Sequence, residues 1–305
     1  MFAPSGLLQI LVALAISPLL IGVIHRTKAV VAGRHGQPWL QVYFDLWKLL
    51  HKSAVFSRTT TPVFALGPIL SCSAAGIALL VIPMAGSPAA VSFPGDFLLM
   101  AYLLGLARFF TVAAALDTGS SFEGMGASRE VFFSALAEPA LLLAMATLVC
   151  FSHSLSLSEI YARLGLGIVG PQAVPAMLLV AAALMVVFLA ENARIPFDDP
   201  NTHLELTMIH EVMVLDHSGP DFAMIQYGAC LKMWILGSLL VGVFIPWRSG
   251  APLLDLAAGV GAMLLLAVVT GVVESAMARL RLVRVPQLLV AASILSTIAL
   301  VLVTR

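Results

Sequence analysis

The chain has 305 residues, of which 60% are hydrophobic and 10% are charged, and its formal net charge is zero. A soluble domain usually carries roughly a quarter charged residues, so this composition excludes an ordinary soluble protein and indicates a polytopic membrane protein. The balanced charge gives no reason to expect nucleic-acid binding. The cysteines lie far apart in apolar runs, which excludes a disulfide framework, a zinc site or an iron–sulfur cluster held by this chain alone: Cys72, Cys150 and Cys230.

Eight apolar segments are long enough to cross a bilayer. A hydrocarbon core about 30 Å thick needs roughly 20 apolar residues in a helix, and the segments lack the alternation of transmembrane strands. We therefore predict an all-α protein, with residues 1–305 forming a single integral membrane domain. The spans are expected at about 7–24, 62–84, 97–116, 131–151, 172–190, 222–246, 253–273 and 287–303.

Lysine and arginine are distributed unevenly between the connections. The connections on one side contain Arg26, Lys28, Arg34, Lys48, Lys52, Arg58, Arg129, Arg194, Arg279, Arg281 and Arg284. The other side contains only Arg163, Arg248 and Arg305. Positive charge collects on the cytoplasmic side of a membrane. We therefore expect both termini on the outer side of the cell's inner membrane and residues 191–221 on its cytoplasmic side.

The first connection contains a segment with helical periodicity, PWLQVYFDLWKLLHKS at residues 38–53. Its apolar residues recur at the spacing of one helix face, and Asp45 and Lys48 lie on the opposite stripe. One interpretation is a helix lying in the membrane interface. The other, compatible with the first, is a docking surface for a cytoplasmic subunit.

Charges also lie well inside three predicted spans, at Arg108, Glu138 and Lys232. A charge near the bilayer centre costs at least about 2.5–3.5 kcal/mol on insertion scales, so it is expected to face protein or water. Pro139 follows Glu138 and removes a backbone hydrogen bond, which suggests a proton-holding site at a kink. A static Arg108–Glu138 ion pair that only positions helices is the alternative.

The third predicted span is followed by DTGSSFEGMGASRE, a segment rich in glycine and serine. One interpretation is a flexible solvent loop. The other is a polar contact surface formed by Asp117, Glu123, Arg129 and Glu130.

The connection after the fifth predicted span is acidic. Pro196 and Pro200 predict a turn, and Thr202 with Glu205 matches a capping box, which predicts a helix over about 203–215. Closely spaced carboxylates raise one another's pKa, so such groups can take up and release protons. Its acidic residues are Glu191, Asp198, Asp199, Glu205, Glu211 and Asp216, with Arg194 among them.

Histidines recur in the same connection at His203, His210 and His217. On a helix they would lie roughly 10 Å apart, which is too far to share one metal ion. We expect them to pass protons beside the carboxylates instead.

Several motifs in this chain can be compared with known families. The run from Glu191 through Arg194 to Phe197-Asp198, followed by Glu205-Leu206 and by Ser218-Gly219, resembles the acidic run of the quinone-site membrane subunit family of respiratory complex I. Leu116-Asp117-Thr118-Gly119-Ser120 and Gly126-Ala127-Ser128-Arg129-Glu130 resemble the hydrogenase branch, which includes formate hydrogenlyase subunit 4 and the group 4 nickel–iron hydrogenases. Further matches to this branch are the first-connection motif from Gly33-Arg34 through Asp45 to Lys48, Glu138-Pro139, and Glu274 with Arg279. We expect Arg34, Glu274 and Arg279 to help dock the partner subunits.

The resemblance implies a membrane anchor that couples a redox arm to ion-pumping subunits. The implied partners are hydrogenase-like large and small subunits, an iron–sulfur protein and antiporter-like membrane subunits, besides membrane lipid. Iron–sulfur clusters, and in the hydrogenases a nickel–iron centre, would belong to those partners, and this chain would bind no cofactor itself. The resemblance implies that Glu191, Asp198, Glu205 and Asp216 are acidic entry residues, with Arg194 as their counter-charge.

Asn201 and His203 replace carboxylates of the complex I pattern, and Asp216-His217 replaces its Glu-Tyr pair. These differences favour the quinone-independent, hydrogenase-like branch. A quinone-binding subunit of a complex I-like dehydrogenase and a free-standing secondary transporter are the alternatives. The pumped ion, proton or sodium, is left open.

Overall fold

The protein is a bundle of helices in a computed structural model that describes residues 4–84, 87–165, 173–198, 208–245 and 249–304. Eight helical segments in these ranges have the length and apolar character to cross a membrane. The eight are α1 with Pro4–Val31, α3 with Pro62–Ala78, α4 with Asp96–Asp117, α5 with Ser121–Ser152, α7 with Val174–Glu191, α8 with Gly219–Phe244, α9 with Pro252–Ala276 and α10 with Val285–Thr304. The predicted fold class and number of spans are confirmed.

Shorter helices complete the described structure. Two are α-helices, α2 with Gln41–Leu50 and α6 with Leu157–Gly165. Three are single 3₁₀ turns: η1 with Leu79–Val81, η2 with Glu211–Val214 and η3 with Leu282–Arg284.

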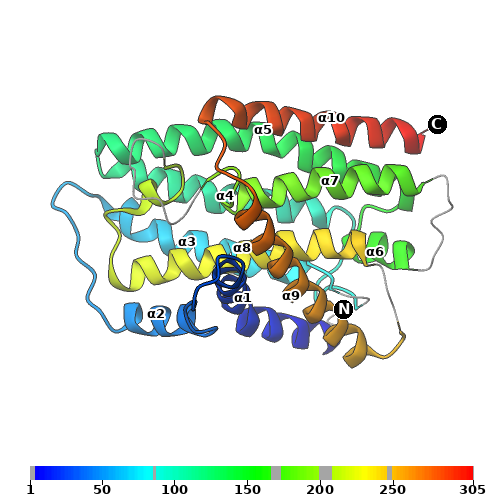
Figure 1. Ribbon diagram of the computed structural model, residues 1–305, viewed down its shortest axis with the longest axis horizontal. Coiled ribbons are helices and arrows are strands. Elements are labelled where there is room, and N and C mark those ends of the chain that lie inside the picture. The colour runs from blue at the N-terminus through cyan, green and yellow to red at the C-terminus, as the bar shows by residue number, and fades with distance from the viewer. Residues whose placement is uncertain (1–3, 85–86, 166–172, 199–207, 246–248, 305) are drawn as a thin grey trace.

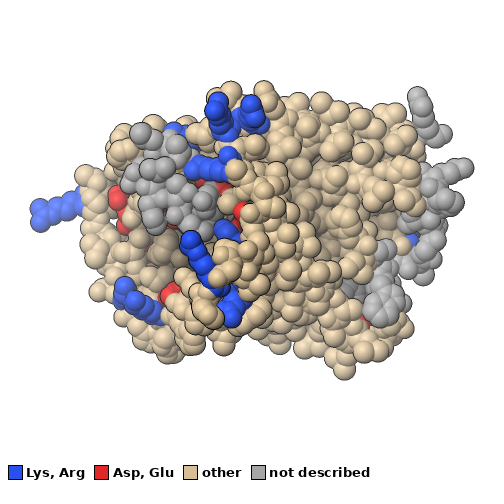
Figure 2. All heavy atoms as spheres, in the orientation of Figure 1, with Lys and Arg blue, Asp and Glu red and all other residues tan. Residues whose placement is uncertain are grey.

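Two ends of the bundle can be distinguished in Figure 1. Both marked chain ends lie in its right half, whereas α2 and η2 lie at the left. The blue Lys and Arg spheres in Figure 2 gather mostly in the same left half. We call this the basic end of the bundle.

The helices pack by local pairing. In Figure 1, α10, α5 and α7 run side by side along the upper edge, and α9 crosses the bundle obliquely. Further contacts join α3 to both α4 and α8, and α1 to α9. Ser296 of α10 donates a hydrogen bond to the backbone oxygen of Ala140 in α5 at 3.0 Å, which adds a polar link to an otherwise apolar contact.

The glycine-rich segment before the fourth predicted span is helical, so its interpretation as a flexible loop is wrong. Helix α5 already begins at Ser121, and Gly126 and Ala127 are buried within it. A Cβ atom at Gly126 would collide with the Val212 side chain of η2. The small residues therefore permit close packing against the acidic connection.

The predicted helix over 203–215 is wrong for the residues that the structure describes. Only the 3₁₀ turn Glu211–Val214 forms within 208–215, and residues 199–207 lie outside the described ranges. A turn is present at residues 195–197, and the end of the turn predicted between Pro196 and Pro200 lies outside the described residues. Pro196 accepts a backbone hydrogen bond from Leu280 at 2.9 Å, which attaches this turn to the segment after α9.

Two helices extend beyond their predicted boundaries at the basic end. Helix α1 continues to Val31, so Arg26 and Lys28 lie in its last turns and not in the connection. Helix α9 continues to Ala276, which places Glu274 inside it. These extensions bring charged side chains of distant helices within reach of one another.

Candidate functional site

Arg108 of α4 joins carboxylates from two other helices. Its Nη1 atom lies 2.6 Å from Oε1 of Glu138, and its Nη2 atom lies 2.7 Å from both carboxylate oxygens of Glu191. Its Nε atom lies 3.7 Å from Oε1 of Glu130. One guanidinium therefore connects α4 to both α5 and α7.

Two further groups extend this network. Nζ of Lys232, in α8, lies 2.8 Å from Oε2 of Glu191, and Nδ1 of His210 lies 3.5 Å from Oε2 of Glu130. We call the whole set the Arg108 cluster: Arg108, Glu130, Glu138, Glu191, His210 and Lys232. It combines three carboxylates with two permanent cations, so the acids are in excess unless His210 is protonated or a carboxylate holds a proton.

The members of the Arg108 cluster differ in exposure. The side chain of Glu191 is 7% exposed and that of Arg108 is 12% exposed, whereas that of Glu138 is 53% exposed. Glu138 therefore lies at the surface of this single chain, while its carboxylate remains paired with Arg108. Its side chain lines a cavity of about 230 Å³ that lies mainly between α4 and α5, together with Tyr102 and Leu98.

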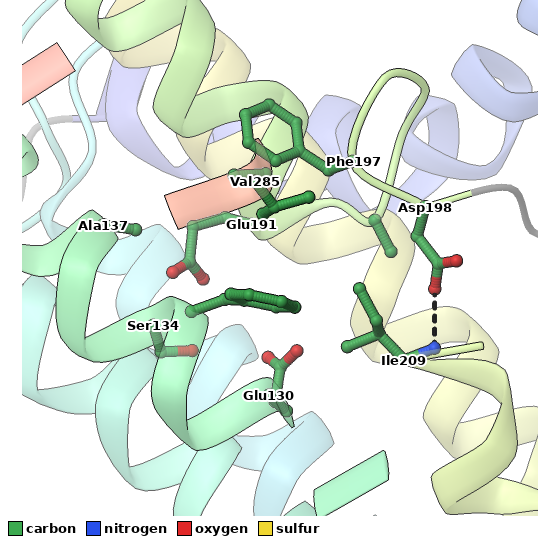
Figure 3. Close-up of a pocket in the computed structure, with 11 residues that line it drawn as sticks. Glu130, Ser134, Ala137, Glu191, Phe197, Asp198, Ile209 and Val285 are labelled. Carbon is green, nitrogen blue, oxygen red and sulfur yellow. Dashed lines mark hydrogen bonds between the residues drawn. The ribbon is translucent and has the colours of Figure 1, made fainter. Parts of the chain in front are cut away.

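A small cavity of about 20 Å³ lies where the Arg108 cluster meets the acidic connection. Glu130, Glu191 and Asp198 are among the residues that line it. Figure 3 shows Asp198 across the cavity from Glu191, with its carboxylate turned toward the backbone nitrogen of Ile209. A space of this size is about that of one water molecule.

Arg194 belongs to a different group of charges. Its Nη1 atom lies 3.5 Å from Oε1 of Glu274, whose Oε2 atom lies 2.8 Å from Nζ of Lys28. We call Lys28, Arg194 and Glu274 the Glu274 cluster. Among the described residues Arg194 thus pairs with a carboxylate of α9. Its implied role as counter-charge to the acidic connection, part of which lies outside those residues, stays a prediction.

Asp198 lies between the two clusters. Its Oδ1 atom lies 2.9 Å from Nη2 of Arg279. Its Oδ2 atom accepts hydrogen bonds from the backbone nitrogens of Ile209 and His210, at 3.0 and 3.2 Å. Asp198 thereby holds in place the segment that carries the His210 ring to Glu130.

The remaining acids of the connection do not all gather at the Arg108 cluster. Asp199 and Glu205 lie outside the described residues. Glu211 is half-buried on η2, and Asp216 is exposed. Of the acids that the structure describes, Glu191 joins the cluster through its ion pairs, and Asp198 contacts it through the backbone nitrogen of His210.

The residues expected to form a docking surface occupy several environments. Arg34 and Lys48 are exposed near the basic end, and the Asp45 carboxylate accepts a hydrogen bond from Gln41. Asp117 accepts two hydrogen bonds from Thr61, and Arg129 donates one to the backbone oxygen of Met208. Glu123 and Glu130 are buried, and Glu274 and Arg279 form internal ion pairs, so these four do not form an exposed surface.

The histidines of the connection have separate surroundings. The His217 ring stacks on Phe64 with ring centroids 3.9 Å apart, and burial lowers the pKa of His217 to about 4. His203 lies outside the described residues. Within the described ranges, no cluster of three or more His, Cys, Asp or Glu side chains is placed to hold a metal ion.

Sequence reasoning did not predict the partners of His210 and Lys28. His210 lies 80 positions from Glu130, and Lys28 lies 246 positions from Glu274. No periodicity connects residues at such separations. A search for opposite charges at the same ends of spans could have suggested Lys28 with Glu274.

A family comparison gives these clusters a context. The NADH dehydrogenase family matches residues 5–305. The chain belongs to this family. Membership explains why the motifs resembling complex I occur in order along the whole sequence.

Individual members of the NADH dehydrogenase family show which branch is most similar. Formate hydrogenlyase subunit 4 of Escherichia coli is 32% identical over 288 residues, covering 92% of each chain. Hydrogenase-4 component C of the same organism is 31% identical and covers 79% of this chain and 75% of its own. A subunit of the NADH-quinone oxidoreductase of Neisseria meningitidis serogroup C is 27% identical, covering 70% and 62%. The predicted resemblance to the hydrogenase branch is confirmed.

A solved structure shares the fold. A chain of the membrane-bound sulfane sulfur reductase, an archaeal respiratory membrane complex, superposes with a TM-score of 0.84. The match covers 98% of both chains at 21% sequence identity. The arrangement of spans is therefore shared, while residue roles must be argued from the present chain.

Proposed function

We propose that this chain is the membrane anchor and coupling subunit of a complex I-related complex of the group 4 hydrogenase or formate-hydrogenlyase type. In this role it links redox chemistry in a cytoplasmic arm to the movement of protons or sodium ions across the membrane. The similarity to two hydrogenase-complex subunits supports the choice of branch.

The Arg108 cluster is the observation that carries the coupling role. Its carboxylates outnumber its permanent cations, and it joins side chains of α4, α5, α7 and α8 inside a membrane protein. Charges at short range interact far more strongly in a protein interior than in water. A change of charge at one end of such a network therefore alters proton affinity at the other.

The connection to the redox arm runs through His210 and Asp198. The His210 ring contacts Glu130, while the backbone beside it is held by Asp198. A partner that changes charge against this connection would alter the contact between His210 and Glu130. The consequence would reach Arg108 through Glu130, and from there both Glu191 and Glu138.

The orientation predicted from the distribution of lysine and arginine also determines where the partners would dock. The basic end of the bundle would face the cytoplasm and a redox arm containing the hydrogenase-like and iron–sulfur subunits, with both termini outside. Arg34, Lys48 and Asp117 would contribute to that contact. The half-exposed Glu138 would face an antiporter-like membrane subunit, because an ionisable group is costly in lipid.

The test is the substitution Glu191→Gln in the complete complex, reconstituted into vesicles. Glutamine keeps the shape but removes the charge and the proton-holding group. We expect the complex to assemble and to retain redox turnover, while the rate of ion movement falls at least about tenfold, which corresponds to a barrier about 1.4 kcal/mol higher for the coupled step. Ion movement and redox turnover are measured on the same vesicles.

Glu159→Gln is the matched control. Glu159 is exposed on α6, away from the Arg108 cluster, and its substitution makes the same chemical change. It should leave the ratio of ions to electrons unchanged. Normal ratios in both Glu191→Gln and Glu138→Gln would contradict the proposal and make the Arg108 cluster structural.

A quinone-binding role is the second candidate, since relatives include subunits of NADH-quinone oxidoreductases. The two roles differ in their response to inhibitors that compete with quinone. Hydrogen-linked turnover that is insensitive to such inhibitors supports the hydrogenase-type role. Turnover that requires added quinone would replace it with the second candidate.

A further inference from the structure

A basic cavity lies at the basic end of the bundle, apart from the Arg108 cluster. Its volume is about 520 Å³, and it is bounded by the end of α1, the following loop and the last turn of α9. Its polar lining consists of His25, Lys28, Arg34, His35, Gln37 and Ser275. None of the described residues that line it is acidic.

The loop wall of this cavity is held in place by backbone contacts. Arg26 donates from Nη1 to the backbone oxygen of Gly36 at 3.0 Å, and the backbone nitrogen of Arg34 donates to Ala29 at 2.8 Å. Gly33 has a φ of +67°, a left-handed conformation that glycine adopts without strain and that lets the chain turn at the end of α1. The cavity is thus built by ordered backbone.

Positive charge in the cavity exceeds what the neighbouring carboxylate can balance. Glu274, just behind the lining residue Ser275, already pairs with both Lys28 and Arg194. Arg34 is exposed, and its guanidinium has no ion pair with any part of the chain that the structure describes. A ligand with negative charge would satisfy it.

Apolar side chains flank this basic cavity. Val31, in the last turn of α1, is 56% exposed, and it lines the cavity together with Ala29 and Ala32. A soluble anion would leave these side chains in water. A ligand with a negatively charged head and hydrocarbon chains would cover both surfaces.

We infer that this cavity binds the phosphate headgroup of an anionic membrane lipid. The ends of membrane-spanning helices lie at headgroup depth, and basic pockets between such helices bind anionic headgroups. Arg34 and His35 contact the phosphate from the loop, Lys28 contributes from α1, and the acyl chains contact the apolar lining at Val31. This site uses no residue of the Arg108 cluster, but it shares Arg34 with the docking contact proposed above, so lipid binding to the assembled complex is measured separately.

The test uses the full-length chain purified in a mild neutral detergent. Binding of phosphatidylglycerol and of phosphatidylcholine with identical acyl chains is compared by native mass spectrometry. We expect phosphatidylglycerol to bind at least about tenfold more tightly. Arg34→Gln should weaken that binding about fivefold, from about 1 kcal/mol per basic residue near a membrane surface, and leave phosphatidylcholine binding unchanged.

Arg58→Gln is the matched control, since Arg58 is exposed in the same connection but does not line the cavity. It should retain wild-type affinity, and His35→Gln provides a second cavity variant if Arg34→Gln does not fold. Equal affinity for the two lipids, or equal losses in Arg34→Gln and Arg58→Gln, would overturn the inference.

Two further binding measurements distinguish other possible ligands of the cavity. Full displacement of the lipid by millimolar inorganic phosphate would assign the cavity to a free phosphate compound instead. Loss of the phosphatidylglycerol preference in the assembled complex would assign it to an acidic segment of a partner subunit. A preference for phosphatidylglycerol that persists in both measurements supports the lipid site.

Discussion

The Arg108 cluster and the Glu274 cluster are both networks of charge between membrane-spanning helices, but they are balanced in opposite ways. In the Arg108 cluster, carboxylates outnumber permanent cations, and each cation has a carboxylate within 2.8 Å. In the Glu274 cluster, one fully buried carboxylate serves two cations, Lys28 and Arg194. Both clusters adjoin cavities, the second through Lys28, but the Glu274 side chain itself has an exposure of 0%, whereas that of Glu138 is 53% exposed.

This difference separates a network that can change its charge from one that cannot. A surplus of carboxylates leaves room for a proton to be bound or released while Arg108 keeps partners. Removing the negative charge of Glu274 would take this carboxylate from both the buried Arg194 and the partly exposed Lys28. The comparison therefore predicts that substitutions in the two clusters will affect different measurements.

Glu274→Gln should have the largest effect on stability. Breaking a buried ion pair by removing one partner costs about 3–5 kcal/mol, because the remaining charge is left uncompensated. Thermal and denaturant unfolding of the purified chain in detergent would measure the loss. The double variant Lys28→Gln/Glu274→Gln should recover part of the lost stability. If Glu274→Gln alone were as stable as wild type, the two clusters would not differ in their contribution to stability.

Acidification should have the next largest effect, through a contact that belongs to neither cluster. His217 is buried against Phe64 and its pKa is lowered to about 4. The ordinary histidine pKa is about 6.5, so the unfolded chain binds a proton more readily than the folded one. Stability from this contact is complete above about pH 6.5 and falls as the pH decreases toward 4, by up to about 3 kcal/mol.

The variant His217→Phe isolates the contribution of this histidine. Phenylalanine keeps a ring against Phe64 but does not titrate. Between pH 7.5 and 4.5 the melting temperature should fall less in the variant than in wild type. Identical pH profiles would show that the loss of stability in acid comes from the carboxylates of the clusters alone.

Glu138→Gln should have the smallest effect on stability, below about 1 kcal/mol. Its side chain is half-exposed, and pairs of that kind contribute little. Arg108 also keeps both oxygens of Glu191 within 2.7 Å. Ion movement in reconstituted complexes should nevertheless fall, and a large loss of stability without a transport defect would assign Glu138 a structural role.

The fold was largely predictable because hydrophobic length alone identifies a membrane span. The error at residues 121–130 arose because glycine and serine are typical of loops, while here Gly126 packs closely against Val212. The error at residues 208–215 arose because a capping motif specifies how a helix begins, whereas tertiary contacts decide whether it continues. Both segments pack against each other, so neither could be predicted separately.

The charged residues of the candidate site could be selected from the sequence, but most of the ion pairs between them could not. Arg108, Glu138 and Lys232 could be selected because charges inside spans are costly. The Arg108–Glu138 pair was named correctly, since both belong to adjacent spans. The assignment of Arg194 required the structure, because its partner Glu274 lies 80 positions away on a helix that crosses the bundle obliquely.

The half-exposed Glu138 has a consequence for how cells make this protein. A copy without its membrane neighbour would present an ionisable group to lipid, which is costly. Unassembled copies would then be held in a less favourable state than assembled ones and would be better substrates for membrane proteases. The abundance of this protein would thereby follow the supply of its partners, so that stoichiometry in the complex is set by degradation of the surplus.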